Sequence, residues 1–323
     1  MTELGGRHVD VFSLPMNVRF RGVDHREGIV LQGPAGWGEF SPFWDYGVEE
    51  SADWLAAALE AADAGFPRQV RDLVPVNCTV PAVGPDQAAS IVTGRHGCTT
   101  AKVKVAEPGQ PFDADLARVA AVRAAMGPAA KIRVDANGGW SVAQAVHAIG
   151  LLSEFGLEYV EQPTRTVEEL AAVRRRVDVP IAADESIRRA DDPARVARLG
   201  AADIAVLKVQ PLGGVRGSLR LAEEVGLPVV VSSALESSVG IAAGVALAAA
   251  LPELPYACGL ATTSMFEYDL AAPAMRPVDG CLAVRRVEPQ PDLLDAARAD
   301  PETVARWHER LSACLAALAD RRR

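Results

Sequence analysis

The sequence has few cysteines and histidines, and neither type forms a recognisable motif. The cysteines are an odd number, are widely scattered and include no Cys-x-x-Cys pair. This argues against a disulfide framework or a zinc site and favours a reduced, cytoplasmic compartment. The five histidines are dispersed without an HExxH segment, which argues against histidine catalysis. We expect small buried residues at Cys78, Cys98, Cys258, Cys281 and Cys314.

Excess positive charge and long apolar runs are also lacking. Lys plus Arg number 33 against 42 Asp plus Glu, a formal net charge of -9, so binding to nucleic acid or an anionic membrane surface is not favoured. The most apolar run, residues 240–251, is shorter than the about 20 residues that cross a bilayer. The start, MTELGGRHVDVF, lacks the features of a secretory signal. We expect a cytoplasmic protein whose partner is a small-molecule carboxylate, with no nucleic acid, no membrane and no indicated oligomeric state.

From Pro75 onward the sequence repeats one unit. Each unit has a short apolar, β-branched run, a turn and an Ala-rich stretch with apolar residues at helical spacing. Eight such runs alternating with helices predict a (β/α)8-like barrel, with an open doubly wound sheet as the competing interpretation. The predicted strands are residues 76–82, 101–105, 131–137, 158–163, 180–186, 204–209, 228–234 and 256–262.

The two ends of the chain depart from this repeat. Residues 1–75 contain strand-like segments and a helical stretch, Glu49–Ala64, which predict an α+β unit. Residues 76–275 form the predicted barrel. Residues 276–323 are punctuated by prolines and end in a helical tail, Pro301–Asp320, that we expect to pack on the N-terminal unit. The predicted fold class is therefore α/β, with an N-terminal α+β domain and a C-terminal return segment.

Five consecutive predicted strands carry a charged residue near their C-terminal ends, where barrel enzymes place their active sites. A charge between apolar neighbours needs a neutralising partner, because an unpaired buried charge is costly. In chain order these residues are Lys104, Asp135, Glu161, Asp184 and Lys208.

The three acids of this series predict a metal site. Carboxylates on neighbouring strands repel one another unless a cation lies among them, and the absence of nearby His or Cys indicates Mg²⁺ rather than Zn²⁺. Lys104 and Lys208, four strands apart in a ring of eight, should face each other across the barrel mouth. This arrangement suits removal of a proton α to a carboxylate that binds the metal, because the ion stabilises the enediolate. The ion and a nearby ammonium would lower the pKa of a lysine toward that of a general base.

At these positions the sequence resembles the enolase superfamily in order, spacing and residue type. The matching segments are Lys102-Val103-Lys104, Val134-Asp135-Ala136-Asn137, Val160-Glu161-Gln162-Pro163, Asp184-Glu185-Ser186 and Leu207-Lys208. The resemblance implies an enolase-type barrel with Mg²⁺ held by Asp135, Glu161 and Asp184, and Lys104 and Lys208 as the acid/base pair. It also implies that the N-terminal unit, which contains GWGEFSPF, is a capping domain that closes over the substrate.

Three further segments resemble a dehydratase branch of this superfamily that serves menaquinone biosynthesis. They are Arg19–Gly22 with Arg26–Gly28, Val231–Ser238, and Gly259–Thr262. The resemblance implies a hydro-lyase that removes water from 2-succinyl-6-hydroxy-2,4-cyclohexadiene-1-carboxylate. Racemisation of N-succinylamino acids is the alternative, because some relatives catalyse both reactions. A non-catalytic metal-binding barrel is a more remote alternative.

Several other polar residues are candidates for binding the substrate. Lys102 and Arg133 share faces with Lys104 and Asp135, so each either lies beside the site or pairs with a carboxylate elsewhere in the barrel. Serines at a strand end bind substrate or cap a helix, and arginines near the start of the chain cap the pocket or are solvated. The candidates are Lys102, Arg133, Asn137, Ser232, Ser233, Arg19 and Arg21. Gly213-Gly214 precedes a predicted helix and resembles a phosphate cradle, on weak grounds.

Overall fold

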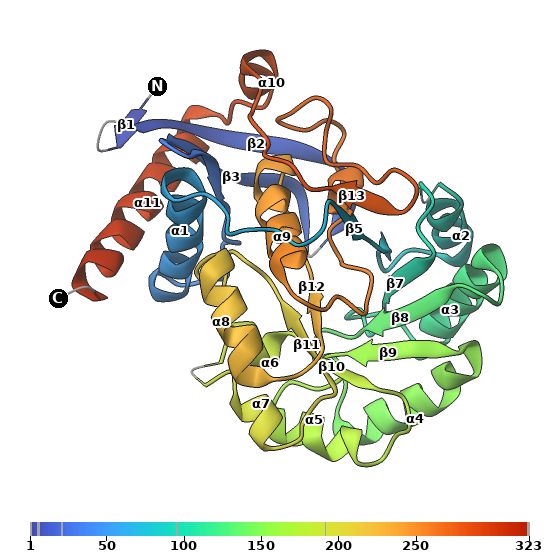
Figure 1. Cartoon of the computed structure of the whole chain (residues 1–323). Coiled ribbons are helices and arrows are strands. Elements are labelled where there is room, and N and C mark those ends of the chain that lie inside the picture. The colour runs from blue at the N-terminus through green and yellow to red at the C-terminus, as the bar shows by residue number, and fades with distance from the viewer. Residues whose placement is uncertain (1, 5–6, 21, 95, 191, 322–323) are drawn as a thin grey trace.

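The computed structural model describes residues 2–4, 7–20, 22–94, 96–190 and 192–321. Within these ranges an antiparallel sheet near the N-terminus lies against a larger parallel sheet that curls on itself and is surrounded by helices (Figure 1). No helix of these ranges is both long and apolar enough to cross a membrane.

The N-terminal sheet is antiparallel, with its strands in chain order. They are β1 (Thr2–Leu4), β2 (Arg7–Phe20), β3 (Val23–Gly33) and β4 (Gly36–Phe40). Helix α1 (Val48–Asp63) packs on β4 so closely that a Cβ at Gly38 would lie 2.0 Å from the carbonyl oxygen of Ala58. Only glycine permits this approach, so Gly38 fixes the distance between helix and sheet.

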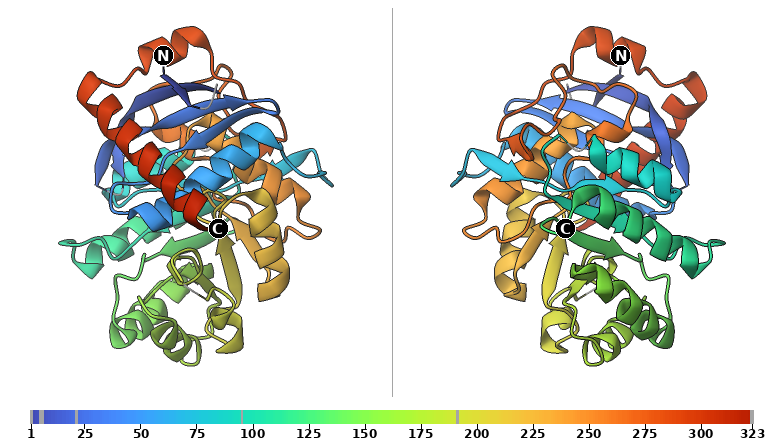
Figure 2. Two further views of the ribbon diagram at one scale, coloured as in Figure 1. Left: turned by 90° about the vertical axis from the view of Figure 1, so that its left-hand side faces the viewer. Right: turned by 90° about the vertical axis from the view of Figure 1, so that its right-hand side faces the viewer.

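The C-terminal helix α11 (Pro301–Arg321) lies beside α1 on this N-terminal unit (Figures 1 and 2). Trp307 is fully buried and packs edge-on against Phe40, with ring centroids 5.8 Å apart. Arg310 is also buried, and its Nη2 donates a hydrogen bond to the carbonyl oxygen of Tyr46 over 2.8 Å. The end of the chain therefore packs on the unit formed by its beginning.

The parallel sheet has seven strands in the order β12-β11-β10-β9-β8-β7-β6. Their sequences are almost continuously apolar because helices cover the outer face and side chains fill the inside. The strands are β6 (Cys78–Val80), β7 (Thr100–Lys104), β8 (Lys131–Asp135), β9 (Leu157–Glu161), β10 (Ile181–Ala183), β11 (Ile204–Leu207) and β12 (Val229–Val231).

The eighth predicted strand, residues 256–262, closes the sheet without forming a regular strand. Cys258 makes a parallel bridge to Val76, and Gly259 makes a parallel bridge to Ser232. These bridges join the β6 edge to the β12 edge. The barrel prediction is therefore confirmed, with seven strands and one bridging segment, and the open doubly wound alternative is wrong.

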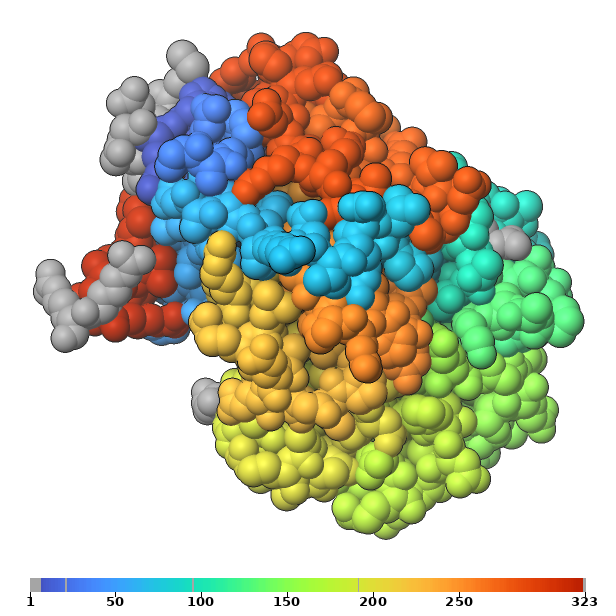
Figure 3. All heavy atoms as spheres, in the orientation of Figure 1, coloured from blue at the N-terminus to red at the C-terminus, as the bar shows by residue number. Residues whose placement is uncertain are grey.

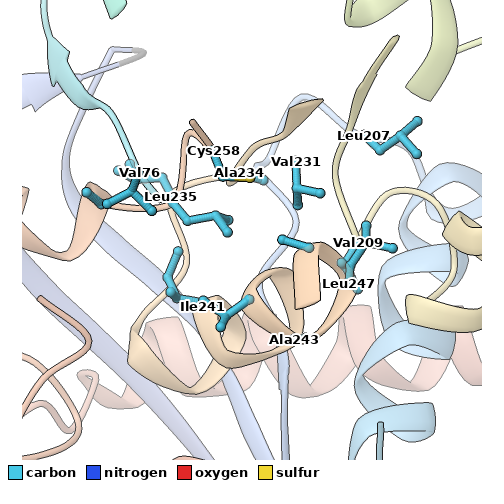
Figure 4. Packing of buried hydrophobic residues seen from close by; sticks show 14 of the residues in the cluster. Val76, Leu207, Val209, Val231, Ala234, Leu235, Ile241, Ala243, Leu247 and Cys258 are labelled. Atoms are coloured by element: carbon cyan, nitrogen blue, oxygen red, sulfur yellow. The ribbon is translucent and has the colours of Figure 1, made fainter. Parts of the chain in front are cut away.

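Helices connect successive strands on the outside of the barrel (Figure 1). They are α2 (Pro85–Thr93), α3 (Phe112–Met126), α4 (Val142–Leu152), α5 (Val167–Arg174), α6 (Glu185–Arg188), α7 (Arg195–Arg198), α8 (Val215–Val225) and α9 (Ser238–Ala250). Helix α9, the most apolar run of the sequence, is buried on nearly all sides. Its Ile241 and Leu247 lie in the same apolar cluster as Val231, Leu235 and Cys258 (Figure 4). Burial on nearly all sides explains why α9 has apolar residues around its whole circumference.

The segments that join the two units run over the surface. Strand β5 (Leu73–Pro75) pairs with β13 (Cys281–Ala283), which precedes α10 (Pro291–Ala296). Just before β5, Arg71 Nη1 donates to the carbonyl oxygen of Leu251 over 2.7 Å, at the end of α9. Figure 3 shows the light-blue to cyan segment that contains β5 as a band across this face. We propose the predicted boundaries near residues 75 and 275 as the limits between the N-terminal unit, the barrel and the C-terminal segment.

Candidate active site

Three buried acids lie at adjacent strand ends. Asp135 is the last residue of β8, Glu161 is the last residue of β9, and Asp184 follows β10 directly. Asp135 and Glu161 are register partners in the sheet. All three side chains are at most 1% exposed. Parallel pairing of β8, β9 and β10 therefore brings these carboxylates into one row.

Lysine ammonium groups contact each carboxylate of this row. Lys102 Nζ lies 2.6 Å from Glu161 Oε1 and 3.0 Å from Asp135 Oδ2. Lys104 Nζ lies 2.5 Å from Asp135 Oδ2. At the other end of the row, Lys208 contacts Asp184 in the same way. The structure thus brings the predicted acids and lysines together.

Lys208 and Arg188 share the carboxylate of Asp184. Lys208 Nζ lies 2.6 Å from Oδ2, and Arg188 Nε donates to Oδ1 over 2.9 Å. The Arg188 guanidinium also contacts the hydroxyl of Tyr46, a residue of the N-terminal unit. Lys208 follows β11 and Lys104 is the last residue of β7. Strands β8, β9 and β10, which carry the three acids, therefore lie between the two lysines.

The charges of the row are unevenly compensated. Burial acts to raise the pKa of Asp135, but the ammonium groups of Lys102 and Lys104 together outweigh it and hold this pKa below its usual value. Burial also acts to raise the pKa of Asp184, but the positive charges of Arg188 and Lys208 together outweigh it and lower this pKa. At Glu161 burial prevails, and the neighbouring Asp135 adds to it, so that the pKa rises to about 7. The middle of the row is therefore where further positive charge is most stabilising.

Two of the three lysines that contact this row, Lys102 and Lys208, respond differently to burial. Burial acts to lower the pKa of Lys102, but the charges of Asp135 and Glu161 raise it well above its usual value. Burial lowers the pKa of Lys208, and the charge of Asp184 only partly opposes this shift. Lys102 is therefore a permanent cation, whereas Lys208 gives up its proton more readily than an exposed lysine.

The donor set of the row fits a hard divalent ion. Within the described ranges no three His, Cys, Asp or Glu side chains converge on one point as they lie, because ammonium and guanidinium groups occupy most of the carboxylate oxygens. One oxygen, Oε2 of Glu161, is buried and has no hydrogen-bond partner among the described residues. Three carboxylates with an unsatisfied oxygen in their midst are ligands of the type that Mg²⁺ prefers.

A narrow pocket of about 40 Å³ lies beside the acids and lysines. A wider groove of about 740 Å³ adjoins it and shares Phe20, Lys104, Asn137 and Arg188 with it. The pocket is lined by Phe20, Thr79, Lys102, Lys104, Asn137, Arg188, Lys208, Ser232, Ser233, Ala234, Leu235, Gly259 and Thr262. Six sequence-predicted residues therefore meet in one pocket: Lys102, Lys104, Asn137, Lys208, Ser232 and Ser233.

Asn137 connects Lys104 to the next layer of the site. Its Oδ1 accepts a hydrogen bond from Lys104 Nζ over 2.5 Å, and its Nδ2 donates to Glu185 Oε1 over 3.1 Å. Its backbone has a φ of 45°, a left-handed conformation that Asn tolerates better than most residues. Asn137 thus links the ammonium of Lys104 to the carboxylate of Glu185.

The structure does not bring Arg133 to this pocket. Its guanidinium is fully buried and turns toward the N-terminal side of the barrel. There Nε donates to Glu158 Oε2 over 2.6 Å, and Nη1 donates to the carbonyl oxygen of Ala257 over 2.6 Å. The interpretation of Arg133 as a substrate-binding residue is therefore replaced by a role in the barrel interior.

Of the two candidate arginines of the N-terminal unit, the structure describes only Arg19. Arg19 is exposed, lines the wider groove, and donates through Nε to the carbonyl oxygen of Gly22 over 3.2 Å. Arg21 lies outside the described residues. Arg19 therefore lies at the entrance of the site rather than beside the lysines.

Among the pocket residues that were not predicted as site residues, Phe20 and Arg188 contact charged side chains of the site. Phe20 reaches the pocket from the end of β2, and its ring lies 5.5 Å from Lys104 Nζ. No local signal marks it, because the contact depends on how the two units pack. Arg188 does have a signal, since it follows Asp184 by four residues and therefore shares its helical face.

Two other features do not belong to the site. The Gly213-Gly214 pair precedes α8, but the carboxylate of Glu60 already accepts hydrogen bonds from the first backbone N–H groups of α8. This helix end is therefore capped by the N-terminal unit. A larger hollow, about 860 Å³, lies on the outer face near Trp44 and contains none of the acids or lysines described above.

Comparison with known proteins places the chain in a family. Residues 86–290 match the family described as enolase C-terminal domain-like, and residues 11–62 match the family described as enolase N-terminal domain-like. The chain belongs to the enolase superfamily. Enzymes of this superfamily generally depend on a divalent metal ion.

Curated relatives are similar over almost the whole chain. An o-succinylbenzoate synthase of Thermobifida fusca (strain YX) is 62% identical over 95% of this chain and 95% of its own. Proteins of the same name from Mycolicibacterium smegmatis and Mycobacterium bovis (strain BCG / Pasteur 1173P2) are 56% and 55% identical, each over 95% of this chain and 94% of theirs.

Solved structures support the fold. Muconate lactonizing enzyme from Pseudomonas fluorescens has a TM-score of 0.79 at 22% identity, with 91% of this chain and 98% of that chain covered. The L-Ala-D/L-Glu epimerase of Bacillus subtilis has a TM-score of 0.75 at 23% identity, with 88% and 96% covered. These similarities show the enolase-type barrel with its N-terminal capping domain.

Proposed function

We propose that this chain is an o-succinylbenzoate synthase. It removes water from 2-succinyl-6-hydroxy-2,4-cyclohexadiene-1-carboxylate to give o-succinylbenzoate in menaquinone biosynthesis, and is thus a hydro-lyase. The observation that carries this proposal is the row of three buried carboxylates between Lys104 and Lys208, in a chain 55–62% identical to proteins of this name. None of the five cysteines, which all lie in the described ranges, forms a disulfide, and this supports a cytoplasmic location.

The metal of the proposed enzyme is Mg²⁺, and Asp135, Glu161 and Asp184 are the residues that would hold it. The fit rests on three oxygen-donor side chains at consecutive strand ends and on the unpartnered Oε2 of Glu161. When bound, the ion would stabilise the negative charge that develops on the substrate carboxylate as the α-proton leaves.

Lys104 is the proposed base. It removes the proton α to the ring carboxylate and returns a proton to the departing hydroxide on the same face, which gives a syn elimination. Contacts to Asp135 and Asn137 hold its Nζ at the pocket wall, so little reorganisation is needed before proton transfer. One lysine can serve both steps because the abstracted proton stays on it between them.

Lys208 is proposed to remain an ammonium on the opposite side. From there it stabilises the enolate electrostatically as charge builds up. Its ion pair with Asp184 favours the charged form against the effect of burial. The pocket lies between these two amines, since both line it.

The rest of the pocket is proposed to bind the substrate. Ser232 and Ser233 provide hydroxyl groups at the end of β12, and Ser233 Oγ lies 2.8 Å from Thr262 Oγ1. Lys102 is proposed to set the charge of the site without touching the reacting carbon, because its ammonium is already held by two carboxylates. Arg19, at the entrance, is proposed to meet the substrate as it enters. The same role is proposed for Arg21 from the sequence alone.

Racemisation of N-succinylamino acids is the second candidate function. The observation that favours it is the placement of Lys104 and Lys208 at opposite ends of the acid row, where each can reach one face of an α-carbon. Racemase activity predicts solvent deuterium exchange at the α-position of both enantiomers. An enzyme that only dehydrates predicts slow exchange with at least one of them.

The decisive experiment compares specificity constants. The purified chain is assayed with Mg²⁺, once with the cyclohexadiene substrate and once with N-succinylamino acids. The proposal predicts a larger kcat/KM for dehydration. A larger value for racemisation would support the second function, and no turnover of either substrate would support a non-catalytic metal-binding barrel.

A further inference from the structure

Gln162 is a fully buried residue that directly follows Glu161. Its backbone has a φ of 39°, which is left-handed and unfavourable for a residue with a side chain. Such a conformation is strained and persists only when surrounding contacts enforce it. The contacts that enforce it should therefore matter for the site.

The side chain of Gln162 uses its full hydrogen-bonding capacity. Oε1 accepts from the backbone N–H groups of Asp184, over 2.9 Å, and Ser186, over 3.2 Å. Nε2 donates to the carbonyl oxygen of Thr164 over 2.8 Å and to Ser186 Oγ over 2.7 Å. The amide thus binds the backbone on both sides of Glu185 and fixes the turn that presents Asp184.

The backbone of Gln162 connects the remaining strand ends. Its N–H donates to the carbonyl oxygen of Ala182 in β10 over 2.8 Å. Its carbonyl oxygen accepts from the N–H of Gly138, just past β8, over 2.7 Å. One residue therefore connects the ends of β8, β9 and β10, the three strands from which the acids of the row come.

We propose that Gln162 is a positioning residue that holds Asp135, Glu161 and Asp184 at the spacing a divalent ion requires. This inference rests on the proposed function, because it takes these acids as metal ligands. Glutamate cannot replace the amide, because a carboxylate has no N–H donors and would add a fourth negative charge to the row. Methionine has a similar length and shape but makes none of the four hydrogen bonds.

The test measures binding of Mn²⁺ by calorimetry to the full chain and to Gln162→Met. Groups that orient metal ligands typically contribute about 10- to 100-fold to metal affinity, and we expect a loss of this size. The matched control is Gln210→Met, which removes an equally buried amide whose Oε1 accepts from the Ser41 N–H and whose Nε2 donates to Ser41 Oγ. The control should bind Mn²⁺ within about threefold of the parent, because its hydrogen bonds hold Ser41 and not the acids.

Equal Mn²⁺ affinity of parent and Gln162→Met overturns the inference, and so does an equal loss in the two variants. If Gln162→Met does not fold, Ser186→Ala decides, because it removes only the hydroxyl that accepts from Nε2. A severalfold weaker affinity then supports the inference, and an unchanged affinity overturns it. A parent that binds no Mn²⁺ refutes both the inference and the proposed function, whereas a parent that binds Mn²⁺ without dehydrating the substrate refutes only the function.

Discussion

The ammonium of Lys208 lies 2.6 Å from a carboxylate oxygen of Asp184, and both groups are buried. A corresponding pair, Lys104 with Asp135, closes the other end of the acid row. Each amine is thus held by an acid that is itself a proposed metal ligand. Metal binding and the placement of the two amines are therefore coupled in this site.

Removal of the Lys208 ammonium should slow catalysis. Loss of one preorganised charge aimed at a developing anion typically costs about 10²- to 10³-fold in kcat, and we expect this range for Lys208→Ala. Lys131→Ala, at an exposed position in β8, is the control and should leave kcat within about twofold. Steady-state kinetics of the dehydration decide, and a Lys208→Ala variant with the kcat of the parent would contradict the proposed role.

Removal of the divalent ion should abolish dehydration. Treatment with EDTA should eliminate turnover, and added Mg²⁺ should restore it. Asp184→Ala should not be restored to the same extent, because it lacks one of the three proposed ligands. Turnover that persists in EDTA would show that the acid row works without a metal.

Replacement of Arg133 should affect stability rather than substrate binding. Arg133→Met removes a fully buried guanidinium and leaves the partly buried Glu158 without its partner, which should cost about 2–3 kcal/mol. We expect a lower free energy of unfolding in urea and a KM within about threefold of the parent. A large rise in KM with unchanged stability would return Arg133 to the substrate site.

Stability should depend on pH through Glu39. Burial raises the pKa of this carboxyl, at the interface of β4 and α9, to about 7, and the nearby charge of Glu236 adds to the rise. The folded state therefore binds a proton that the unfolded state has released once the pH exceeds the usual value of 4.5. The contribution of Glu39 to stability should thus fall as the pH rises through 7.

The measurement compares parent and Glu39→Gln by urea unfolding at pH 5 and pH 8. The stability of the parent relative to the variant should decrease by about 2–3 kcal/mol between these pH values. An identical change in both proteins would mean that Glu39 is not protonated in the folded state at pH 5.

The acid row and most of the fold were predictable because their signals are local. Apolar runs that end in a charged residue indicate both a buried strand and its functional end, as at Asp135 and Glu161. The strand at residues 256–262 was predicted as regular, but its register allows only two isolated bridges. No local sequence pattern indicates which way a long side chain points. For this reason the prediction that Lys102 lies at the site agrees with the structure, whereas the same prediction for Arg133 does not. Both precede a site residue by two positions, yet only Lys102 points toward the acids.

The contribution of the N-terminal unit could not be predicted in the same way. Phe20 and Tyr46 meet the site only because the two units pack together, and no spacing within either segment indicates this contact. Gln162 belongs to a motif that was recognised, but its hydrogen bonds to Asp184 and Ser186 depend on how β9 and β10 align.

The most direct test of the account is the turnover of Lys104→Ala on the cyclohexadiene substrate in the presence of Mg²⁺. General acid–base catalysis by a positioned side chain contributes about 10²- to 10⁴-fold, and Lys104 is proposed to act in both proton transfers. We expect kcat to fall by at least about 10³-fold while Mn²⁺ still binds. Turnover within about tenfold of the parent would contradict the assignment of Lys104 as the base.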